Sequence, residues 1–560
     1  MVSSSELKAW WKEAVVYQIY PRSFMDSNND GIGDLVGIIQ KLDYLKNLGI
    51  DVIWLSPHFD SPNADNGYDI RDYRKVMAEF GTMADFDQLL TQMKQRGMRL
   101  IIDLVVNHTS DEHQWFLESR QSTDNPYRDY YIWRESKPDT LPNNYPSFFG
   151  GSAWEKDAAT GQYYLHYFAK KQPDLNWDNP QVRADVYDLM RFWLDKGVSG
   201  FRMDVIPFIS KQQGLPDLAP EHLPHPEFVY ANGPYVHDYL QEMNREVLAH
   251  YDTMTVGEAF GITFEQAPLF TDARRHELNM IFHFDLVRLD RDGWRKLAWT
   301  LPDVKAVYGR IDAAASSHGW NTTFLTNHDN PRAVSHFGDD SPEWRSISAK
   351  ALATMMFSQR GTPFLYQGDE LGMTNYPFQN ITDYDDVEVK GQWQDFVLSG
   401  KVSAPDYLAH LAQTSRDNAR TPMQWNTQAQ AGFTTAQPWL AVNPNYPEVN
   451  AEAQTHDTNS VYQHHQRLIT LRKANPVLIY GTYQDLDPEH PQVYAFTRTL
   501  EGKTCLILIN FGHQAIDYTL PNGIRIETVL LDNGAQLEAP ASGSTQITLQ
   551  PWQATIYTVA

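Results

Sequence analysis

The stretch RLIIDLVVN at residues 99–107 has the pattern of a short β-strand, because a β-branched, apolar run ends there on a polar residue. Amphipathic patterns such as DFDQLLTQMKQRG separate such runs and end on Gly, as helices often do. Seven more runs follow the same pattern: VVYQIY from Val15, DVIWLSP from Asp51, GFRMDV from Gly200, TMTVGEAF from Thr253, MIFHFDL from Met280, TTFLTNHD from Thr322 and TPFLYQGDE from Thr362. Eight strands alternating with helices predict an α/β fold, the (β/α)8 TIM barrel.

Two segments depart from this alternation. Between His108 and about Gln172 the helical period fails and Tyr, Trp, Pro and Asn accumulate, which predicts a domain inserted after the third strand as a lid over the barrel mouth. After about residue 480, strands alternate with turn residues, which predicts a C-terminal antiparallel β-sandwich. The expected parts are the first half of the barrel at 1–104, the inserted domain B at 105–176, the second half of the barrel at 177–480 and the sandwich at 481–560.

The charge of the chain restricts its partners. Its 560 residues include 70 acidic and 46 basic side chains, for a formal net charge of −24. Nucleic acid and anionic membrane surfaces bind clustered Lys and Arg, so neither partner is expected. No apolar run approaches the roughly 18 to 20 residues that span a bilayer. A small neutral substrate fits this composition better.

Cysteine usage and the N-terminal residues bear on location. Cys505 is the single cysteine, which excludes an intrachain disulfide and favours a reducing compartment. The start MVSSSELKAWWKEA lacks the basic and apolar regions of a secretory signal. We therefore expect a cytoplasmic protein, and we expect it to be a monomer.

Carboxyl groups follow several of the predicted strands. Asp204 and Glu258 end two of them, and His328 with Asp329 follows a third. Residues at these strand ends meet at the mouth of a TIM barrel, where active sites lie. Glycoside hydrolysis needs one protonated and one ionised carboxyl there. The alternative for any single residue is a buried polar group with a purely structural role.

Four ordered segments, IIDLVVNH, GFRMDV, GEAF and FLTNHDN, resemble the signature regions of glycoside hydrolase family 13, the alpha-amylase family. QPDLNW from Gln172 and GTPFLYQGDE from Gly361 add two further motifs. The resemblance implies that Asp204 is the nucleophile of a retaining alpha-glucosidase and Glu258 is its acid and then its base. It also implies a small neutral oligosaccharide or disaccharide as substrate.

The same resemblance implies further substrate contacts. Asp329 would be a third catalytic carboxylate that grips sugar hydroxyls, assisted by His108 and His328. Arg202 is expected to keep Asp204 ionised, with a low pKa beside a higher-pKa Glu258. By family analogy, the residues that hold the non-reducing glucose are Asp65, Tyr68, Phe168, Gln172 and Arg420.

The segment DSNNDGIGD, residues 26–34, resembles a calcium loop. The expected ligands are the side chains of Asp26, Asn28, Asp30 and Asp34 and the carbonyl of Ile32. The alternative is a solvated acidic turn. The calcium would be structural, and no organic cofactor is expected.

The motifs most resemble the oligo-1,6-glucosidase subgroup, in which Val after the nucleophile accompanies alpha-1,6 bonds and Thr accompanies alpha-1,4 and sucrose-type bonds. Here Val205 occupies that position. The run RLDRD, from Arg288 through Arg291 to Asp292, instead resembles sucrose isomerases, where such a loop contacts the fructosyl unit. We expect a hydrolase of isomaltose that also cleaves isomaltulose and trehalulose. The alternatives are a sucrose isomerase, an alpha-1,4-glucosidase, a trehalose-6-phosphate hydrolase and a catalytically silent binding homologue.

Overall fold

The computed structural model describes residues 8–137, 140–315, 318–534 and 545–560. The first seven residues of the segment inspected for a secretory leader lie outside this part. Among the helices that the structure describes, none has both the length and the apolar character required to cross a bilayer.

Eight parallel strands form the central sheet, in the order β11-β10-β9-β5-β2-β1-β15-β14. Each of the eight predicted runs supplies one of them: β1 (Val16–Ile19), β2 (Val52–Leu55), β5 (Arg99–Leu104), β9 (Gly200–Met203), β10 (Met254–Glu258), β11 (Met280–Phe282), β14 (Thr322–Thr323) and β15 (Thr362–Tyr366). The two end strands nearly close the barrel, since the Thr322 hydroxyl donates to the Ile281 carbonyl at 2.9 Å. The TIM barrel prediction is confirmed.

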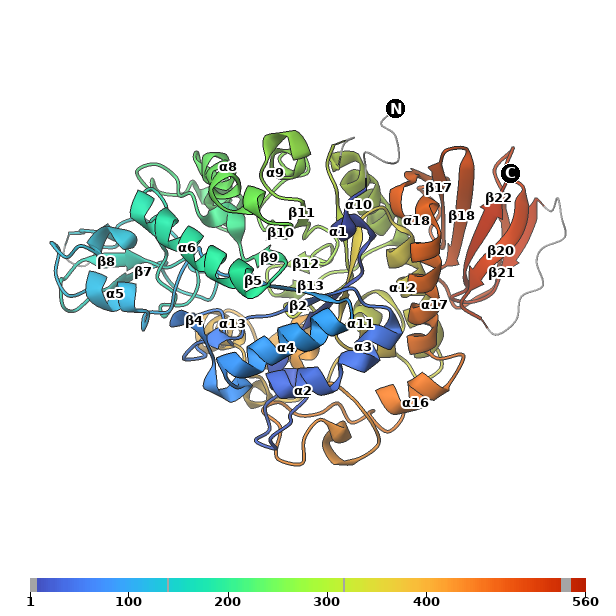
Figure 1. Cartoon of the computed structure of the whole chain (residues 1–560), viewed down its shortest axis with the longest axis horizontal. Coiled ribbons are helices and arrows are strands. Elements are labelled where there is room, and N and C mark those ends of the chain that lie inside the picture. The colour runs from blue at the N-terminus through green and yellow to red at the C-terminus, as the bar shows by residue number, and fades with distance from the viewer. Residues whose placement is uncertain (1–7, 138–139, 316–317, 535–544) are drawn as a thin grey trace.

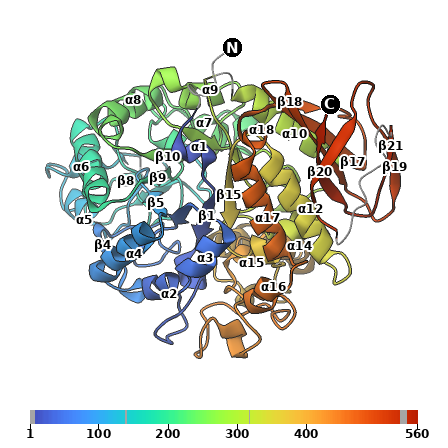
Figure 2. The same cartoon turned by 45° about the vertical axis from the view of Figure 1, so that its right-hand side comes forward.

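Helices surround this barrel (Figures 1 and 2). Local signals start and stop them: Thr82 and Asp85 form a capping box at the start of α4, and Gly197 ends α6 with φ 111°. The main helices are α2 (Leu35–Gln40), α3 (Leu42–Leu48), α4 (Met83–Gln95), α6 (Pro180–Lys196), α8 (Val236–Glu246), α9 (Ala267–Thr271), α10 (Leu301–Ala314), α11 (Ala333–Phe337), α12 (Arg345–Ser358), α13 (Val387–Gln392), α14 (Ala404–Thr414), α15 (Asp417–Arg420), α16 (Ala451–His456), α17 (Val461–Ala474) and α18 (Pro476–Tyr480).

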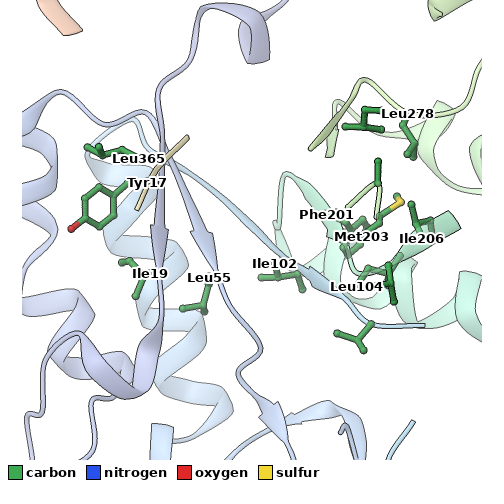
Figure 3. Close-up of a cluster of buried hydrophobic side chains, with 14 of the residues drawn as sticks. Tyr17, Ile19, Leu55, Ile102, Leu104, Phe201, Met203, Ile206, Leu278 and Leu365 are labelled. Atoms are coloured by element: carbon green, nitrogen blue, oxygen red, sulfur yellow. The ribbon is translucent and has the colours of Figure 1, made fainter. Parts of the chain in front are cut away.

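The strands carry two apolar layers. Val52 and Ile101 belong to one buried cluster, whereas their neighbours Ile53 and Ile102 belong to another. This alternation places one layer inside the barrel and the other against the helices, because successive side chains of a strand point to opposite faces. Figure 3 shows members of the second cluster on several strands, among them Leu55 on β2, Ile102 on β5 and Phe201 on β9. The barrel is thus a filled core that holds the strand ends in place.

The segment between β5 and α6 leaves the barrel as a separate unit, at the far left of Figure 1. It contains α5 (Gln114–Ser119) and a three-stranded sheet in the order β6-β8-β7, formed by β6 (Trp133–Arg134), β7 (Trp154–Lys156) and β8 (Tyr163–Leu165). A buried ammonium ties this unit to the barrel. Lys211 Nζ lies 2.7 Å from Asp174 Oδ2, and it donates to Asn107 Oδ1 at 2.6 Å and to the Phe208 carbonyl at 2.7 Å.

The C-terminal part is a pair of antiparallel sheets, at the right of Figure 1. Apolar residues of both sheets, such as Leu506 and Leu549, form a cluster between them, while Phe496 and Ile507 on the other face join the barrel core. The larger sheet is β16 (Thr482–Asp485), β17 (Val493–Leu500), β18 (Lys503–Asn510), β22 (Ala554–Val559) and β20 (Ile526–Asp532), and the smaller is β19 (Ile516–Thr519) with β21 (Gln546–Leu549). The predicted sandwich is present.

Candidate active site

A cavity of about 520 Å³ opens at the carboxyl ends of the barrel strands. Four other predicted site residues, Gln172, Arg202, His328 and Arg420, are buried and do not line it. The predicted residues that do line it are Asp65, Tyr68, His108, Phe168, Asp204, Val205, Glu258, Arg288, Arg291 and Asp329. The cavity therefore brings the three predicted catalytic carboxyls together.

The guanidinium of Arg202 joins the carboxyls of three strands. Its Nη1 lies 2.7 Å from Asp204 Oδ1 and 2.5 Å from Asp103 Oδ1, and its Nη2 lies 2.6 Å from Glu258 Oε2. Arg202 is buried on β9, between β5, which carries Asp103, and β10, which carries Glu258. The parallel register thus places the two proposed catalytic carboxyls on one cation.

The expectation of a low pKa for Asp204 is wrong in direction. Burial raises the pKa of Asp204 well above its usual range, and the charges of Glu258 and Asp103 raise it further against the attraction of Arg202. Arg202 Nη1 and Nη2 hold Asp204 and Glu258 on the same guanidinium, so each carboxyl acts on the other at short range. Two like charges held this close oppose each other's ionisation.

Val205, directly after Asp204, adopts a left-handed backbone with φ 33° and ψ 39°. This conformation costs a β-branched residue on the order of 1–3 kcal/mol. It aims the Val205 N–H at Glu258 Oε2, at 3.0 Å. The strained turn therefore supplies a backbone donor to the proposed acid, while the Val205 side chain lines the cavity.

Asp329 is surrounded by nitrogen atoms. Arg420 Nη2 lies 2.9 Å and Arg416 Nη1 lies 3.2 Å from Asp329 Oδ1, and His328 Nε2 lies 3.1 Å from Oδ2. Burial opposes ionisation, but His328, Arg416 and Arg420 outweigh it and hold the pKa of Asp329 below its usual range. Burial lowers the pKa of His328 to about 3, so near neutral pH the two guanidinium groups carry the charge that stabilises the Asp329 carboxylate.

Gln172 and His108 are polar residues beside Asp65 in the wall of the site. The Gln172 amide donates to Asp65 Oδ2 at 3.1 Å and lies 3.3 Å from His108 Nε2. The Tyr68 ring stacks on His328 at 5.2 Å between centroids and 6° between planes. Burial raises the pKa of Asp65 to about 7. Gln172, which does not line the cavity, thus positions Asp65 and His108, which do.

Arg416 is a site residue that the sequence reading missed. Its guanidinium pairs with Asp329, with Asp65 Oδ1 at 3.4 Å and, most closely, with the buried Asp386. The available signal was its spacing, because Arg416 lies four residues before Arg420, so that one helical turn presents both cations to the same carboxylate.

The two arginines of the RLDRD run lie on another wall of the cavity. The Arg288 guanidinium stands 4.9 Å from the centroid of the Phe260 ring, and Arg291 donates to the Thr414 carbonyl. Burial and the neighbouring Arg288 lower the pKa of Arg291 to about 10. Phe168 faces His108 at 5.3 Å between ring centroids. The positions of Arg288, Arg291 and Phe168 are compatible with the substrate contacts predicted for them. Those contacts remain predictions.

The predicted calcium loop is a compact turn. Asp26 Oδ1 accepts from the amides of Asn28 and Asn29, and Asp30 Oδ1 accepts from the Ile32 amide. Within the described ranges, no cluster of three or more His, Cys, Asp or Glu side chains is close enough to hold a metal ion. A calcium site here would therefore need the amide oxygen of Asn28 and the Ile32 carbonyl beside the carboxylates. Asp26 already accepts four hydrogen bonds and Asp34 accepts three, so calcium would have to replace some of them.

Comparison with known proteins identifies relatives over the whole chain. Residues 18–481 match the family model of the alpha amylase catalytic domain, and residues 483–556 match that of the maltogenic amylase C-terminal domain. An oligo-1,6-glucosidase of Parageobacillus thermoglucosidasius is 52% identical, with 99% of each chain covered. A trehalose-6-phosphate hydrolase of Bacillus subtilis is 45% identical, again with 99% of each covered. A variant of isomaltulose synthase from Erwinia rhapontici NX5, solved with its natural substrate sucrose, is 57% identical, with a TM-score of 0.98 and 99% of each chain covered.

Proposed function

Because this chain belongs to the alpha-amylase family of glycoside hydrolases, we propose that it is a retaining alpha-glucosidase that removes glucose from the non-reducing end of short alpha-1,6-linked sugars. The carrying observation is that Asp204 and Glu258 share one guanidinium, with Arg202 Nη1 2.7 Å from Asp204 Oδ1 and Nη2 2.6 Å from Glu258 Oε2. Inverting enzymes need a wider gap to admit water between the two carboxyls, roughly 6.5–9.5 Å. So close a pair supports double displacement.

In the first step, the Glu258 proton passes to the glycosidic oxygen while Asp204 attacks the anomeric carbon from the opposite face. In this step Glu258 carries the proton and Asp204 is ionised, and the Arg202 guanidinium stabilises the Asp204 carboxylate. In the second step, Glu258 takes a proton from water, whose oxygen displaces Asp204 from the sugar. Asp329, held ionised by Arg416 and Arg420, stabilises the positive charge that develops on the sugar ring.

The choice of bond rests on Val205 and the RLDRD run. Val205 supports alpha-1,6 hydrolysis, as does the identity to oligo-1,6-glucosidases. A second candidate is sucrose isomerase activity, because the chain is 57% identical to an isomaltulose synthase and Arg288 and Arg291 lie in the cavity. In an isomerase the released fructose, rather than water, would attack the glucosyl intermediate.

A substrate panel separates these candidates. We expect the enzyme to release glucose from isomaltose and isomaltulose at least as readily as from maltose. Val205→Thr should move the ratio of alpha-1,4 to alpha-1,6 cleavage upward by about fivefold or more, since a pocket contact of this size is worth about 1–3 kcal/mol. Chromatography of the products measures both. Sucrose converted mainly to isomaltulose or trehalulose would establish the isomerase instead, and an unchanged ratio in Val205→Thr would reduce Val205 to a packing residue.

We further propose a cytoplasmic location, which the single cysteine supports.

We also propose a structural calcium ion in the loop 26–34. Calcium at a hundredfold excess over its Kd would add about 2.7 kcal/mol of stability. Chelation with EGTA should therefore lower the unfolding temperature of the wild type. In Asp30→Asn, the amide oxygen still accepts from Ile32 but the charge is gone, so chelation should have little effect. Equal responses of the two proteins to chelator would refute the site.

A further inference from the structure

Two segments that are far apart in the chain meet beside the active-site cavity. One is the loop 147–151 of the inserted domain, and the other is the end of α13 with the π-helix that follows it, Trp393–Leu398. Both contribute to the cavity wall, since Phe149 lines it from the loop and Gln392 lines it from α13. The shape of this wall therefore depends on how the two segments are held together.

The contact between the segments is made mainly by backbone atoms. Asp395 Oδ2 accepts from the Gly151 amide at 3.1 Å. A Cβ on Gly391 would stand 1.8 Å from the Phe149 carbonyl oxygen, and a Cβ on Gly150 would stand 2.8 Å from Asp395 Oδ2. No side chain fits at Gly391, because its neighbour is a backbone atom. Phe149, Gly150, Gly151, Gly391 and Asp395 form what we call the latch.

The latch places an aromatic ring on Arg416. The centroid of the Phe149 ring lies 5.2 Å from the guanidinium carbon of Arg416, and Phe149 also faces Phe168 at 5.5 Å between ring centroids. A ring at this distance attracts the cation and shields its face from water. Arg416 pairs with Asp65 and Asp329, so its position affects both carboxylates of the cavity.

The segment that carries one half of the latch also holds the edge of the same guanidinium. Arg416 Nε donates to the Asp386 carboxylate at 2.9 Å and lies 3.4 Å from Glu388 Oε2. Asp386 caps the start of α13 by accepting from the Glu388 amide at 2.9 Å, and Gly391 lies on the same helix. Residues 386–395 therefore contact the edge of the guanidinium directly and fix the aromatic ring over its face through the latch.

We propose that Gly391 and Asp395 are positioning residues for Arg416. By fixing the aromatic ring over the guanidinium, they keep Arg416 against the two carboxylates that contact the glucose unit. The inference rests on the proposed glucosidase function. Neither Gly391 nor Asp395 lines the cavity, and Asp329 keeps Arg420 as a second cation. The latch therefore affects binding of the glucose unit, and with it KM, more than the chemical steps that determine kcat.

Substitutions at Asp395 test the assignment. Asp395→Ala removes the acceptor of the latch. We expect KM for isomaltose and for methyl alpha-glucoside, and Ki for glucose, each to rise about fivefold, the effect of one cation–π contact, while kcat stays within about twofold of the wild type. Asp395→Asn keeps an oxygen that can accept from the Gly151 amide, so its KM should stay near that of the wild type.

A double-mutant cycle shows whether the latch acts through the aromatic ring. Phe149→Ala should raise KM at least as much as Asp395→Ala does, and Asp395→Ala added to Phe149→Ala should change KM no further. Gly391→Ala should behave as Asp395→Ala does, because its Cβ displaces the Phe149 carbonyl. Gly309→Ala is the matched control, since a Cβ on Gly309 meets no atom within 4 Å.

The outcomes separate the latch from the proposed function. Unchanged KM in Asp395→Ala and Gly391→Ala overturns the assignment, and so does a loss confined to kcat. Additive effects of Asp395→Ala and Phe149→Ala also overturn it, because Asp395 then acts through another group. Calorimetry of glucose binding needs no turnover. A wild type that binds glucose through the latch but cleaves neither isomaltose nor methyl alpha-glucoside supports the latch and counts against the glucosidase.

Discussion

Asp204→Asn should leave the protein folded and reduce kcat by at least about 10³-fold, because an amide cannot attack the anomeric carbon as a carboxylate does. The side chain is buried, and the replacement keeps its size, while Arg202 retains Asp103 and Glu258 as partners. We expect the far-ultraviolet circular dichroism spectrum and the unfolding temperature to change little. Steady-state hydrolysis of isomaltose measures the loss.

A chemical rescue distinguishes a nucleophile from a residue that is merely important. In Asp204→Ala the space of the carboxyl is free, and azide can attack the anomeric carbon from the face that Asp204 occupied. The product of a good leaving-group alpha-glucoside should then be beta-glucosyl azide. Glu258→Ala is the matched control, because azide there replaces water in the second step and gives the alpha product. Substantial hydrolysis by Asp204→Asn, or an alpha azide from Asp204→Ala, would contradict the assignment of Asp204.

The barrel was predictable because each of its strands is a short apolar run that buries both faces. Residues 99–107 illustrate this, since the predicted run contains the whole of β5. The C-terminal sheets were predictable for a related reason. In β18, Leu506 belongs to one apolar cluster and Ile507 to the other, so both faces are buried and the strand is a short apolar run between polar residues.

Parts of the site could not be predicted, because they combine residues that are far apart in the sequence. Arg416 donates to Asp65, which is 351 positions away in the chain, and no local sequence pattern indicates such a pair. The raised pKa of Asp204 depends on how deeply Asp103, Asp204 and Glu258 are buried around one guanidinium. The left-handed turn at Val205 likewise follows from tertiary contacts, because Val disfavours positive φ.

Lys211→Met should destabilise the protein by about 3–5 kcal/mol, the usual cost of leaving one member of a buried ion pair without its partner. Lys211 is the ammonium that links Asp174 and Asn107, both in the inserted domain, to the Phe208 carbonyl of the barrel. Burial lowers the pKa of Lys211 and raises that of Asp174, so each group depends on the other for its charge. Urea unfolding, with limited proteolysis of the inserted domain, measures the effect.

An exposed ion pair with the same distance is a matched control for the effect of burial. Lys390 Nζ also lies 2.7 Å from a carboxylate, that of Asp385, but both side chains are exposed. Lys390→Met should therefore change stability by no more than about 0.5 kcal/mol. The double variant Lys211→Met with Asp174→Asn should recover much of the loss, because the uncompensated charge is removed and the Asn oxygen can still accept from the Tyr167 amide. If Lys211→Met costs no more than Lys390→Met, the inserted domain is held by its apolar contacts, and the buried pair is incidental to its attachment.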